Sequence, residues 1–150
     1  MTDLVAPTPD DMRDLGRRLA AVVRAGDLLV LTGDLGAGKT TLVQGVAAGL
    51  GAPGPVLSPT FVIARVYRGG RLPLVHVDAY RLGSIEEVDD LDLDAAVEGS
   101  VTVVEWGEGL VESLAADRLQ LDIRRSADEA DETRRVRVSA VGDRWRDVAL

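Results

Sequence analysis

The stretch LTGDLGAGKTTL, residues 31–42, places three glycines between an apolar run typical of a strand and a run typical of a helix. Glycine weakens both kinds of element, so its use here needs a reason. Gly33, Gly38, Lys39 and Thr40 fit the pattern G-x-x-x-x-G-K-[ST], which is typical of a phosphate-binding loop between a strand and a helix. The weaker alternative is a glycine-rich turn in an ordinary α/β domain.

Phosphate binding explains the three glycines and the single lysine of this stretch. Backbone N–H groups can converge on phosphate oxygens only where no side chains intervene, and a helix N-terminus adds partial positive charge. Lys39 is the only lysine beside sixteen arginines. Its compact ammonium suits the terminal phosphates better than a planar guanidinium, so Lys39 is a catalytic candidate. Thr40 offers its hydroxyl to Mg²⁺.

Composition narrows the class of protein. The 150 residues are 46% hydrophobic and 28% charged, which indicates a single soluble, globular domain over residues 1–150. The absence of cysteine excludes disulfides and thiolate zinc sites. No run approaches the roughly 18 apolar residues of a membrane span, and the N-terminus lacks a signal pattern. We therefore expect a cytoplasmic protein with no membrane partner.

The net charge of −8 is unevenly distributed. Residues 82–117 contain eleven acids and no lysine or arginine, whereas the rest of the chain has fourteen acids against seventeen bases. This distribution argues against a stand-alone polyanion binder. The acidic segment either meets a basic partner or only keeps the protein soluble. Acids balance the arginines of residues 124–146, which favours a solvated face there.

Local patterns predict the order of the elements. Thr8 as N-cap and Pro9 at the first helical position begin an amphipathic helix that we expect to end at Gly26. Residues 27–32 form a strand buried on both faces, and the helix after the loop closes at Gly49 or Gly51. Further strands are expected at 61–67, 72–78, 101–105, 118–123 and 134–141, and a helix opens at Ser84 with a capping box.

The first two of these later strands are joined by a Gly-Gly turn at 68–71, which predicts an antiparallel hairpin. The predicted fold is therefore α/β, a P-loop NTPase-like three-layer domain. Its sheet is mixed and mostly parallel, with one antiparallel hairpin.

A phosphate loop also needs a carboxylate at the end of a neighbouring strand. Asp78 closes LVHVD and Glu105 closes VTVVE, and the pattern alone does not rank them. His76 and Asp78 share one face of their strand, so the only histidine also faces the phosphates. For His76, a hydrogen-bonded packing role is favoured over catalysis.

The nucleotide is partly identified by an absence. The chain has no asparagine, so the Asn-Lys-x-Asp guanine signature cannot be present and ATP becomes the expected nucleotide. Thr60, in the SPT loop before the hairpin, either senses a γ-phosphate or metal as a switch loop does, or belongs to a Ser-Pro turn entering a strand.

Four motifs in this order, GDLGAGKTT, SPTF, HVDAYRL and VEWGE, resemble the TsaE family of bacterial ATPases over roughly residues 8–140. The resemblance implies an ATP-binding and ATP-hydrolysing component of the machinery that makes threonylcarbamoyladenosine at adenosine 37 of tRNA. It implies sugar-kinase-like partner proteins of the TsaB and TsaD type, with tRNA contacted indirectly through the complex.

The resemblance also implies a role for each matching residue. Thr40 and Glu105 would hold Mg²⁺, Asp78 would act near the γ-phosphate as base or water orienter, and Thr60 would lie in a switch-like loop. The residues expected around the ATP phosphates are Gly33, Asp34, Leu35, Gly36, Ala37, Gly38, Lys39, Thr40 and Thr41. Gly107 stands where the family more often has proline, a departure that concerns loop shape.

Two other functions stay open. A small-molecule kinase would use Asp78 to activate an acceptor hydroxyl, with RGGR at 68–71 lining the acceptor pocket. A nucleotide-controlled binding module would not hydrolyse ATP at all. The main prediction is a Mg²⁺-dependent ATPase that is slow alone and stimulated by a partner, because no arginine is obviously placed to stabilise the transition state.

Overall fold

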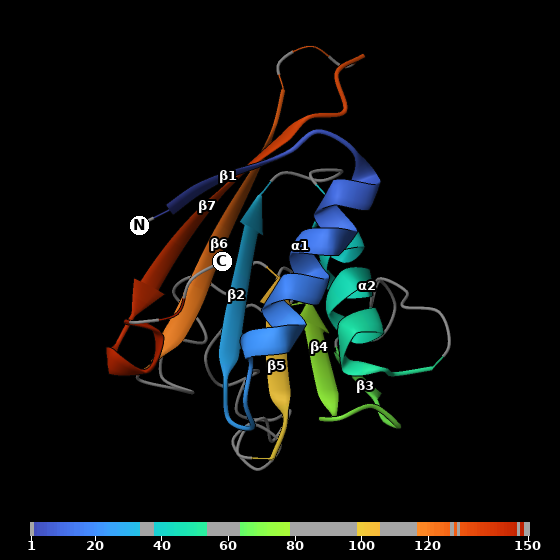
Figure 1. Cartoon of the computed structure of the whole chain (residues 1–150), viewed down its shortest axis with the longest axis vertical. Helices are drawn as coiled ribbons and strands as arrows, with labels where there is room; N and C mark the ends of the chain where they lie inside the picture. The colour runs from blue at the N-terminus through green and yellow to red at the C-terminus, as the bar shows by residue number, and fades with distance from the viewer. Residues whose placement is uncertain are drawn as a thin grey trace.

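The computed structural model describes residues 2–33, 38–53, 64–78, 99–105, 117–126, 128, 130–146 and 148, and this part of the chain is built on one mixed β-sheet with two α-helices (Figure 1). The elements are β1 (Thr2–Ala6), α1 (Pro9–Val22), β2 (Leu28–Gly33), α2 (Lys39–Leu50), β3 (Ala64–Tyr67), β4 (Leu74–Asp78), β5 (Val101–Glu105), β6 (Arg118–Arg125), β7 (Arg134–Val141) and the 3₁₀ helix η3 (Asp143–Trp145).

The seven strands have the order β1-β7-β6-β2-β5-β4-β3. The four strands in the middle, β6, β2, β5 and β4, run parallel, and β3 pairs antiparallel with β4 as the Gly-Gly turn predicts. The expected mixed sheet is confirmed. The structure adds antiparallel pairs at the other edge, β6 with β7 and β7 with β1, which the single predicted hairpin did not include.

Strand β1 is an edge strand that the sequence prediction missed. It pairs with β7 from Thr2↔Val138 to Ala6↔Arg134. On its exposed side, Arg137 Nε donates a hydrogen bond to Asp3 Oδ1 at 3.0 Å. This hydrogen bond, with the positive charges of Arg137 and Arg135, lowers the pKa of Asp3.

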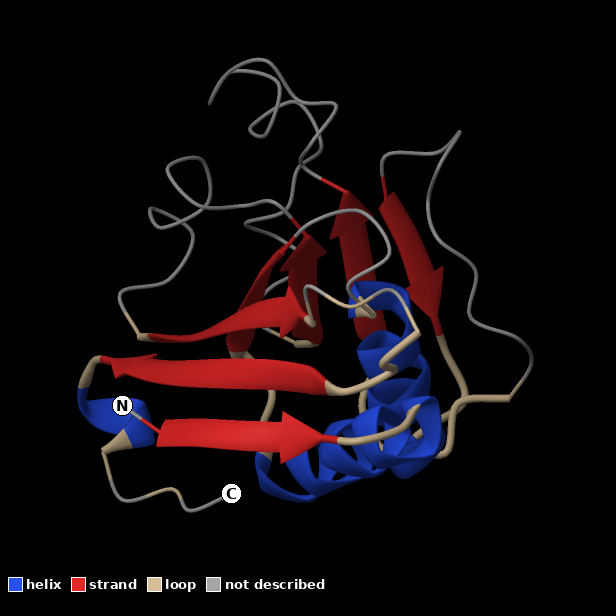
Figure 2. Cartoon of the chain, turned by 90° about the horizontal axis from the view of Figure 1, so that it is seen from above, coloured by secondary structure: helices blue, strands red, loops and turns tan. Residues whose placement is uncertain are grey.

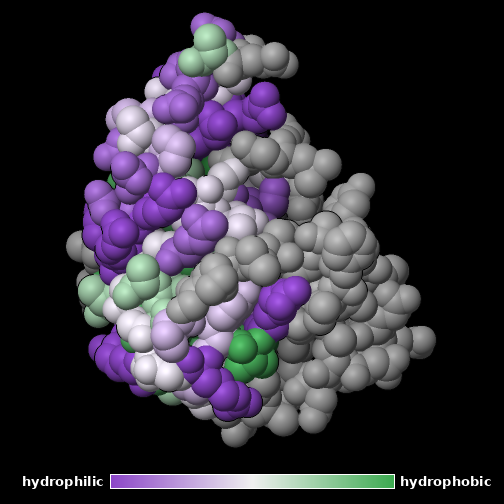
Figure 3. Space-filling view, turned by 90° about the vertical axis from the view of Figure 1, so that its right-hand side faces the viewer, coloured by the Kyte–Doolittle hydropathy of each residue, from purple (hydrophilic) through white to green (hydrophobic). Residues whose placement is uncertain are grey.

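In the view of Figure 3, the described surface is mostly hydrophilic or neutral, with small, separate hydrophobic groups between. Among the described residues, the exposed large hydrophobic side chains are Val5 and Val66, on the two edge strands. No helix in the described ranges is both long and apolar enough to cross a membrane.

Helix α1 begins where the sequence predicts. The Thr8 hydroxyl accepts a hydrogen bond from Asp11 N at 3.2 Å, and Asp11 Oδ2 accepts from Thr8 N at 3.1 Å, which completes a capping box. The helix ends at Val22 and not at the predicted Gly26, because the backbone of Val23 is already extended.

Two arginines from distant segments bind the C-terminal carbonyls of α1. The Arg71 guanidinium donates to Ala20 O at 2.7 Å and to Val23 O at 3.1 Å. Arg144 donates to Val22 O at 2.8 Å. The last turn of α1 has no basic residue of its own, so these side chains supply the positive charge that a helix C-terminus favours.

Both helices lie together on one side of the sheet (Figure 2). They cross so closely that a Cβ atom at Gly45 would overlap the backbone of Arg13, which explains a glycine inside α2. Helix α2 ends before Gly51, as predicted. The helix expected from Ser84, and with it the third layer, lies outside the described residues.

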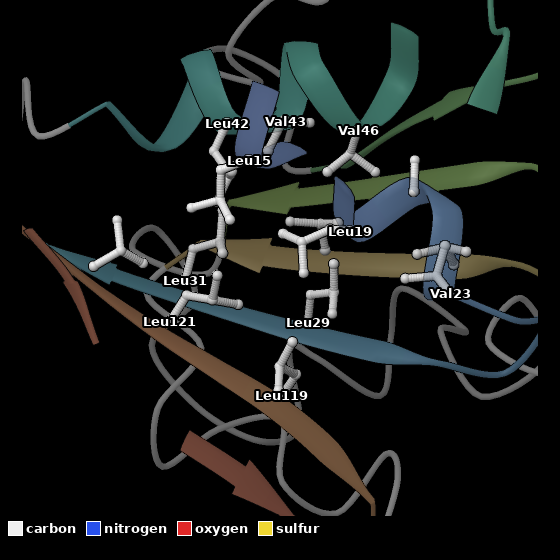
Figure 4. Close-up of a cluster of buried hydrophobic side chains, with 14 of the residues drawn as sticks. Leu15, Leu19, Val23, Leu29, Leu31, Leu42, Val43, Val46, Leu119 and Leu121 are labelled. Carbon is white, nitrogen blue, oxygen red and sulfur yellow. The ribbon is translucent and has the colours of Figure 1, made fainter. Parts of the chain in front are cut away.

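The core between helices and sheet is aliphatic (Figure 4). In β2, Leu29 and Leu31 face the helices, whereas Leu28 and Val30 are buried on the other face, as expected for a strand covered on both sides. The side chains labelled in the close-up are Leu15, Leu19, Val23, Leu29, Leu31, Leu42, Val43, Val46, Leu119 and Leu121.

Candidate nucleotide site

The predicted phosphate loop has the structural context that the motif requires. Strand β2 ends at Gly33 and α2 begins at Lys39, so the loop joins a central parallel strand to a helix N-terminus. Gly38, the N-cap of α2, has φ of 106°, a conformation that glycine adopts without strain. Asp34, Leu35, Gly36 and Ala37 lie outside the described residues.

The N-terminus of α2 is suited to an anion. Gly38 provides no side-chain cap, and the first turn contains no acidic residue. The first N–H groups of a helix lack partners within the helix, so here they can donate to a ligand. Thr40 and Thr41, both partly exposed, lie in this turn.

Lys39 is buried at the start of α2. It is 6% exposed, and its Nζ donates a hydrogen bond to Gly33 O at 2.7 Å. The ammonium therefore lies across the mouth of the loop instead of extending into solvent. An anion stabilises the charge of a buried lysine far more than the charge of a lysine in water, because the dielectric constant around the buried lysine is low.

Both carboxylate candidates lie at the strand ends beside this loop. In the parallel pairs, Leu31 of β2 is opposite Glu105 of β5, and Glu105 is opposite Asp78 of β4. The carboxyl ends of the three strands therefore meet at one edge of the sheet. Glu105 is 5% exposed. Asp78 is placed here by its backbone alone, and Thr60 lies outside the described residues.

His76 bonds to one of these carboxylates. Its Nε2 lies 2.6 Å from Glu105 Oε2, and the imidazole is fully buried. The expected hydrogen-bonded, buried histidine is confirmed. Its partner was not predicted, because the two residues are 29 positions apart and meet only through the pairing of β4 with β5.

A cavity of about 150 Å³ adjoins the phosphate loop. It lies between the N-terminus of α1, the start of α2 and the segment that enters β7. The residues that line it are Thr8, Pro9, Met12, Gly38, Thr41, Glu132 and Arg134. Glu132 and Arg134 are more than 90 positions from the loop, so no local pattern connects them with it.

The acceptor pocket of the kinase alternative is not at this site. The turn 68–71 packs against the other end of α2, where Arg71 N donates to Leu50 O at 2.7 Å. Helix α2 has 12 residues and a rise of about 1.5 Å per residue, so its two ends are about 18 Å apart. The residues RGGR therefore cannot line a pocket next to the phosphate loop.

The parallel strand order, the buried lysine at the start of α2 and the carboxylate ending β5 define a P-loop NTPase-like α/β protein. Sequence comparison specifies the family. The family model for "Threonylcarbamoyl adenosine biosynthesis protein TsaE" matches residues 6–136, and the chain belongs to this family.

Similar proteins support this assignment. A Streptomyces coelicolor relative named tRNA threonylcarbamoyladenosine biosynthesis protein TsaE is 61% identical over 138 residues, which cover 89% of this chain and 93% of the relative. A Bacillus subtilis relative of the same name is 43% identical over 138 residues, which cover 91% of this chain and 84% of the relative. The crystal structure of Bacillus subtilis YdiB matches with a TM-score of 0.78 at 37% identity, over 96% of this chain and 88% of that one. The resemblance stated from the four motifs is confirmed.

Proposed function

We propose that this protein is the ATP-binding and ATP-hydrolysing component of bacterial tRNA threonylcarbamoyladenosine biosynthesis and that it acts with partner proteins. Membership of the TsaE family and the names of its relatives support the pathway. The fold by itself does not determine an activity, so the support for the nucleotide chemistry comes from the residues of the site.

One observation carries the proposal: Lys39 is buried at the N-terminus of α2, bonded to Gly33 O, beside the strand that ends in Glu105. The N–H groups of this turn bind phosphate oxygens, and the Lys39 ammonium binds the terminal phosphates of ATP. Among the residues that the structure describes, Lys39 is the one lysine, in keeping with a position where a compact charge is required.

The residues present also suit Mg²⁺. Thr40 supplies a hydroxyl and Glu105 a carboxylate, both hard oxygen donors. Within the described ranges there is no cluster of three or more His, Cys, Asp or Glu side chains around a metal position. Such oxygen donors fit Mg²⁺, which keeps several waters and takes its remaining ligands from phosphates. When bound, Mg²⁺ neutralises charge on the transferring phosphate.

The remaining roles rest on strand position for Asp78 and on the family resemblance for Thr60, which lies outside the described residues. Asp78 ends the strand next to Glu105 and would orient or deprotonate the attacking water near the γ-phosphate. Thr60 would report the γ-phosphate as part of a switch-like loop. The cavity of about 150 Å³ beside Gly38 would take the adenine end of the nucleotide, between Thr8 and Arg134.

The expected partners are sugar-kinase-like proteins of the TsaB and TsaD type, through which the protein would act on tRNA indirectly. Along the sequence, no arginine is obviously placed to stabilise transition-state charge. Such an arginine can come from a partner and is worth about 10³- to 10⁵-fold in related hydrolases.

Phosphate release tests the proposal. We would measure it with ATP and Mg²⁺ alone, with small-molecule acceptors, and with the two partner proteins. Slow release that the partners accelerate supports the proposal. Phosphate transfer to an acceptor would support a kinase, and tight ATP binding with no release under any condition would support a non-hydrolysing binding module.

A further inference from the structure

The geometry of the hydrogen bond between His76 and Glu105 indicates a role for His76 other than packing. His76 Nε2 and Glu105 Oε2 are 2.6 Å apart, and both side chains are almost completely buried, with relative exposures of 0% and 6%. Among the described residues, no other hydrogen bond to the Glu105 carboxylate is present. His76 therefore fixes one carboxylate oxygen, and Glu105 Oε1 is the oxygen left for a ligand.

The tautomer of His76 follows from its surroundings. Its Nδ1 atom is buried and has no hydrogen-bond partner within the described part of the chain. A proton on Nδ1 would be a buried donor without an acceptor, which is more costly than an unused acceptor lone pair. The proton therefore lies on Nε2, which donates it to Glu105.

The hydrogen bond from His76 matters for ligand binding because of where Glu105 lies. The residue ends β5 at the sheet edge beside the phosphate loop, where the proposed function assigns it to Mg²⁺. A glutamate has three rotatable bonds, so a free carboxylate would lose side-chain entropy on taking up a single ligand geometry. A hydrogen bond from a rigid imidazole on the neighbouring strand orients the carboxylate before the ligand binds.

We propose that His76 is a positioning residue that orients the Glu105 carboxylate toward the divalent cation of the bound nucleotide. The inference rests on the proposed function, because it assumes that Glu105 meets a cation. Partners that hydrogen-bond a metal-binding side chain typically contribute about 10- to 100-fold to metal affinity. We expect a contribution of this size to the Mg²⁺-dependent part of ATP affinity.

Two substitutions separate positioning from packing. His76→Gln places an amide nitrogen near the position of Nε2 and keeps the donor, whereas His76→Asn is too short to reach Glu105. Both remove the imidazole ring and put a neutral amide in its place, so they share the loss of the ring and differ in reach by one methylene group. We would measure ATP affinity by calorimetry with Mg²⁺ and again with EDTA, and check folding by thermal unfolding.

The expected result is a loss of about 10- to 100-fold in the Mg²⁺ enhancement of affinity for His76→Asn, with the enhancement largely retained in His76→Gln and the EDTA affinity similar in all forms. Equal losses in both variants, or no loss in His76→Asn, would overturn the proposal. If the wild-type protein itself showed no Mg²⁺-dependent ATP binding, the proposed function would fail, which is a distinct outcome.

The wild-type protein provides a second measurement that needs no substitution. His76 is the only histidine in the chain, so its imidazole nitrogen signals are unambiguous in an NMR spectrum. We expect the Nε2–H tautomer, and a change in the Nε2 signal when Mg²⁺ is added to the ATP-bound protein. An Nδ1–H tautomer, or an Nε2 signal that does not respond to Mg²⁺, would contradict the proposal even if the variants failed to fold.

Discussion

At the scale of single residues, Lys39 is the most direct test of the site. We predict that Lys39→Ala abolishes ATP binding and leaves the fold intact, because the ammonium is directed at the loop through its bond to Gly33 O. Lys39→Arg should also be severely impaired, since the guanidinium fork does not reproduce a compact charge. Calorimetry with ATP measures both, and near-normal affinity in either variant would remove the phosphate-loop assignment.

Substitutions of the two carboxylates at the strand ends should have different effects on ATP affinity and on turnover. If Glu105 holds the metal, Glu105→Ala weakens Mg²⁺-dependent ATP binding. If Asp78 acts in the chemical step, Asp78→Ala keeps ATP affinity and loses turnover by about 10²- to 10⁴-fold. Affinity by calorimetry and single-turnover phosphate release give the two quantities. The opposite pattern, with affinity lost at Asp78 and only rate lost at Glu105, would exchange the roles.

The residues of the site differ in how far the sequence could predict them. Gly33 and Lys39 belong to one local motif, and Glu105 was a candidate because it ends an apolar strand. The bond from His76 to Glu105 depends on β4 lying next to β5, which no local pattern specifies. Arg134 reaches the cavity beside the loop only because β7 joins the sheet at the far side of β6.

At the scale of elements, the 3₁₀ helix η3 is fixed to the turn between α1 and β2 by a buried ion pair. Arg144 Nε and NH2 donate to the two carboxylate oxygens of Asp27 at 3.0 and 2.9 Å, and the guanidinium lies 4.4 Å from the centre of the Trp145 ring. Asp27 Oδ2 also accepts from Arg24 N at 2.6 Å. This network joins η3 to the turn that precedes β2.

We predict that Arg144→Ala lowers the free energy of unfolding by about 3 kcal/mol, because it leaves the buried Asp27 carboxylate without its charge partner. The matched control is Arg146→Ala, two residues further along the chain. Its partner Asp143 is exposed, so we expect a loss below about 1 kcal/mol. Urea unfolding measures both, and equal losses in the two variants would show that the ion pair with Asp27 contributes little.

The sequence predicted those elements whose signals are local. Helix α1 was placed by Thr8 and Pro9, and β2 by an uninterrupted apolar run. Strand β1 was missed because its five residues have no distinctive pattern and gain their hydrogen bonds from β7, more than 125 positions away. Gly45 lowers the helix propensity of α2, and only the close crossing with α1 explains it.

At the scale of the whole molecule, charge is divided between an acidic segment at 82–117 and a slightly basic remainder. The acidic segment contains Glu105, begins soon after Asp78 and lies largely outside the described residues. It therefore brings negative charge close to the site along the chain. A basic face on a partner protein would be steered toward it, and steering of this kind weakens as salt screens the charges.

We predict that complex formation with the TsaB- and TsaD-type partners requires ATP, that association slows as salt rises, and that the partners accelerate turnover. To test the acidic segment, we would change Glu86, Glu87, Asp89 and Asp90 to lysine and follow association by stopped flow across a salt series. Slowed association with a reduced salt slope and intact ATP binding would place the segment on the docking surface. An unchanged rate and salt slope would mean that these acids serve solubility alone, because a docking surface cannot lose and reverse four charges without changing its rate of encounter.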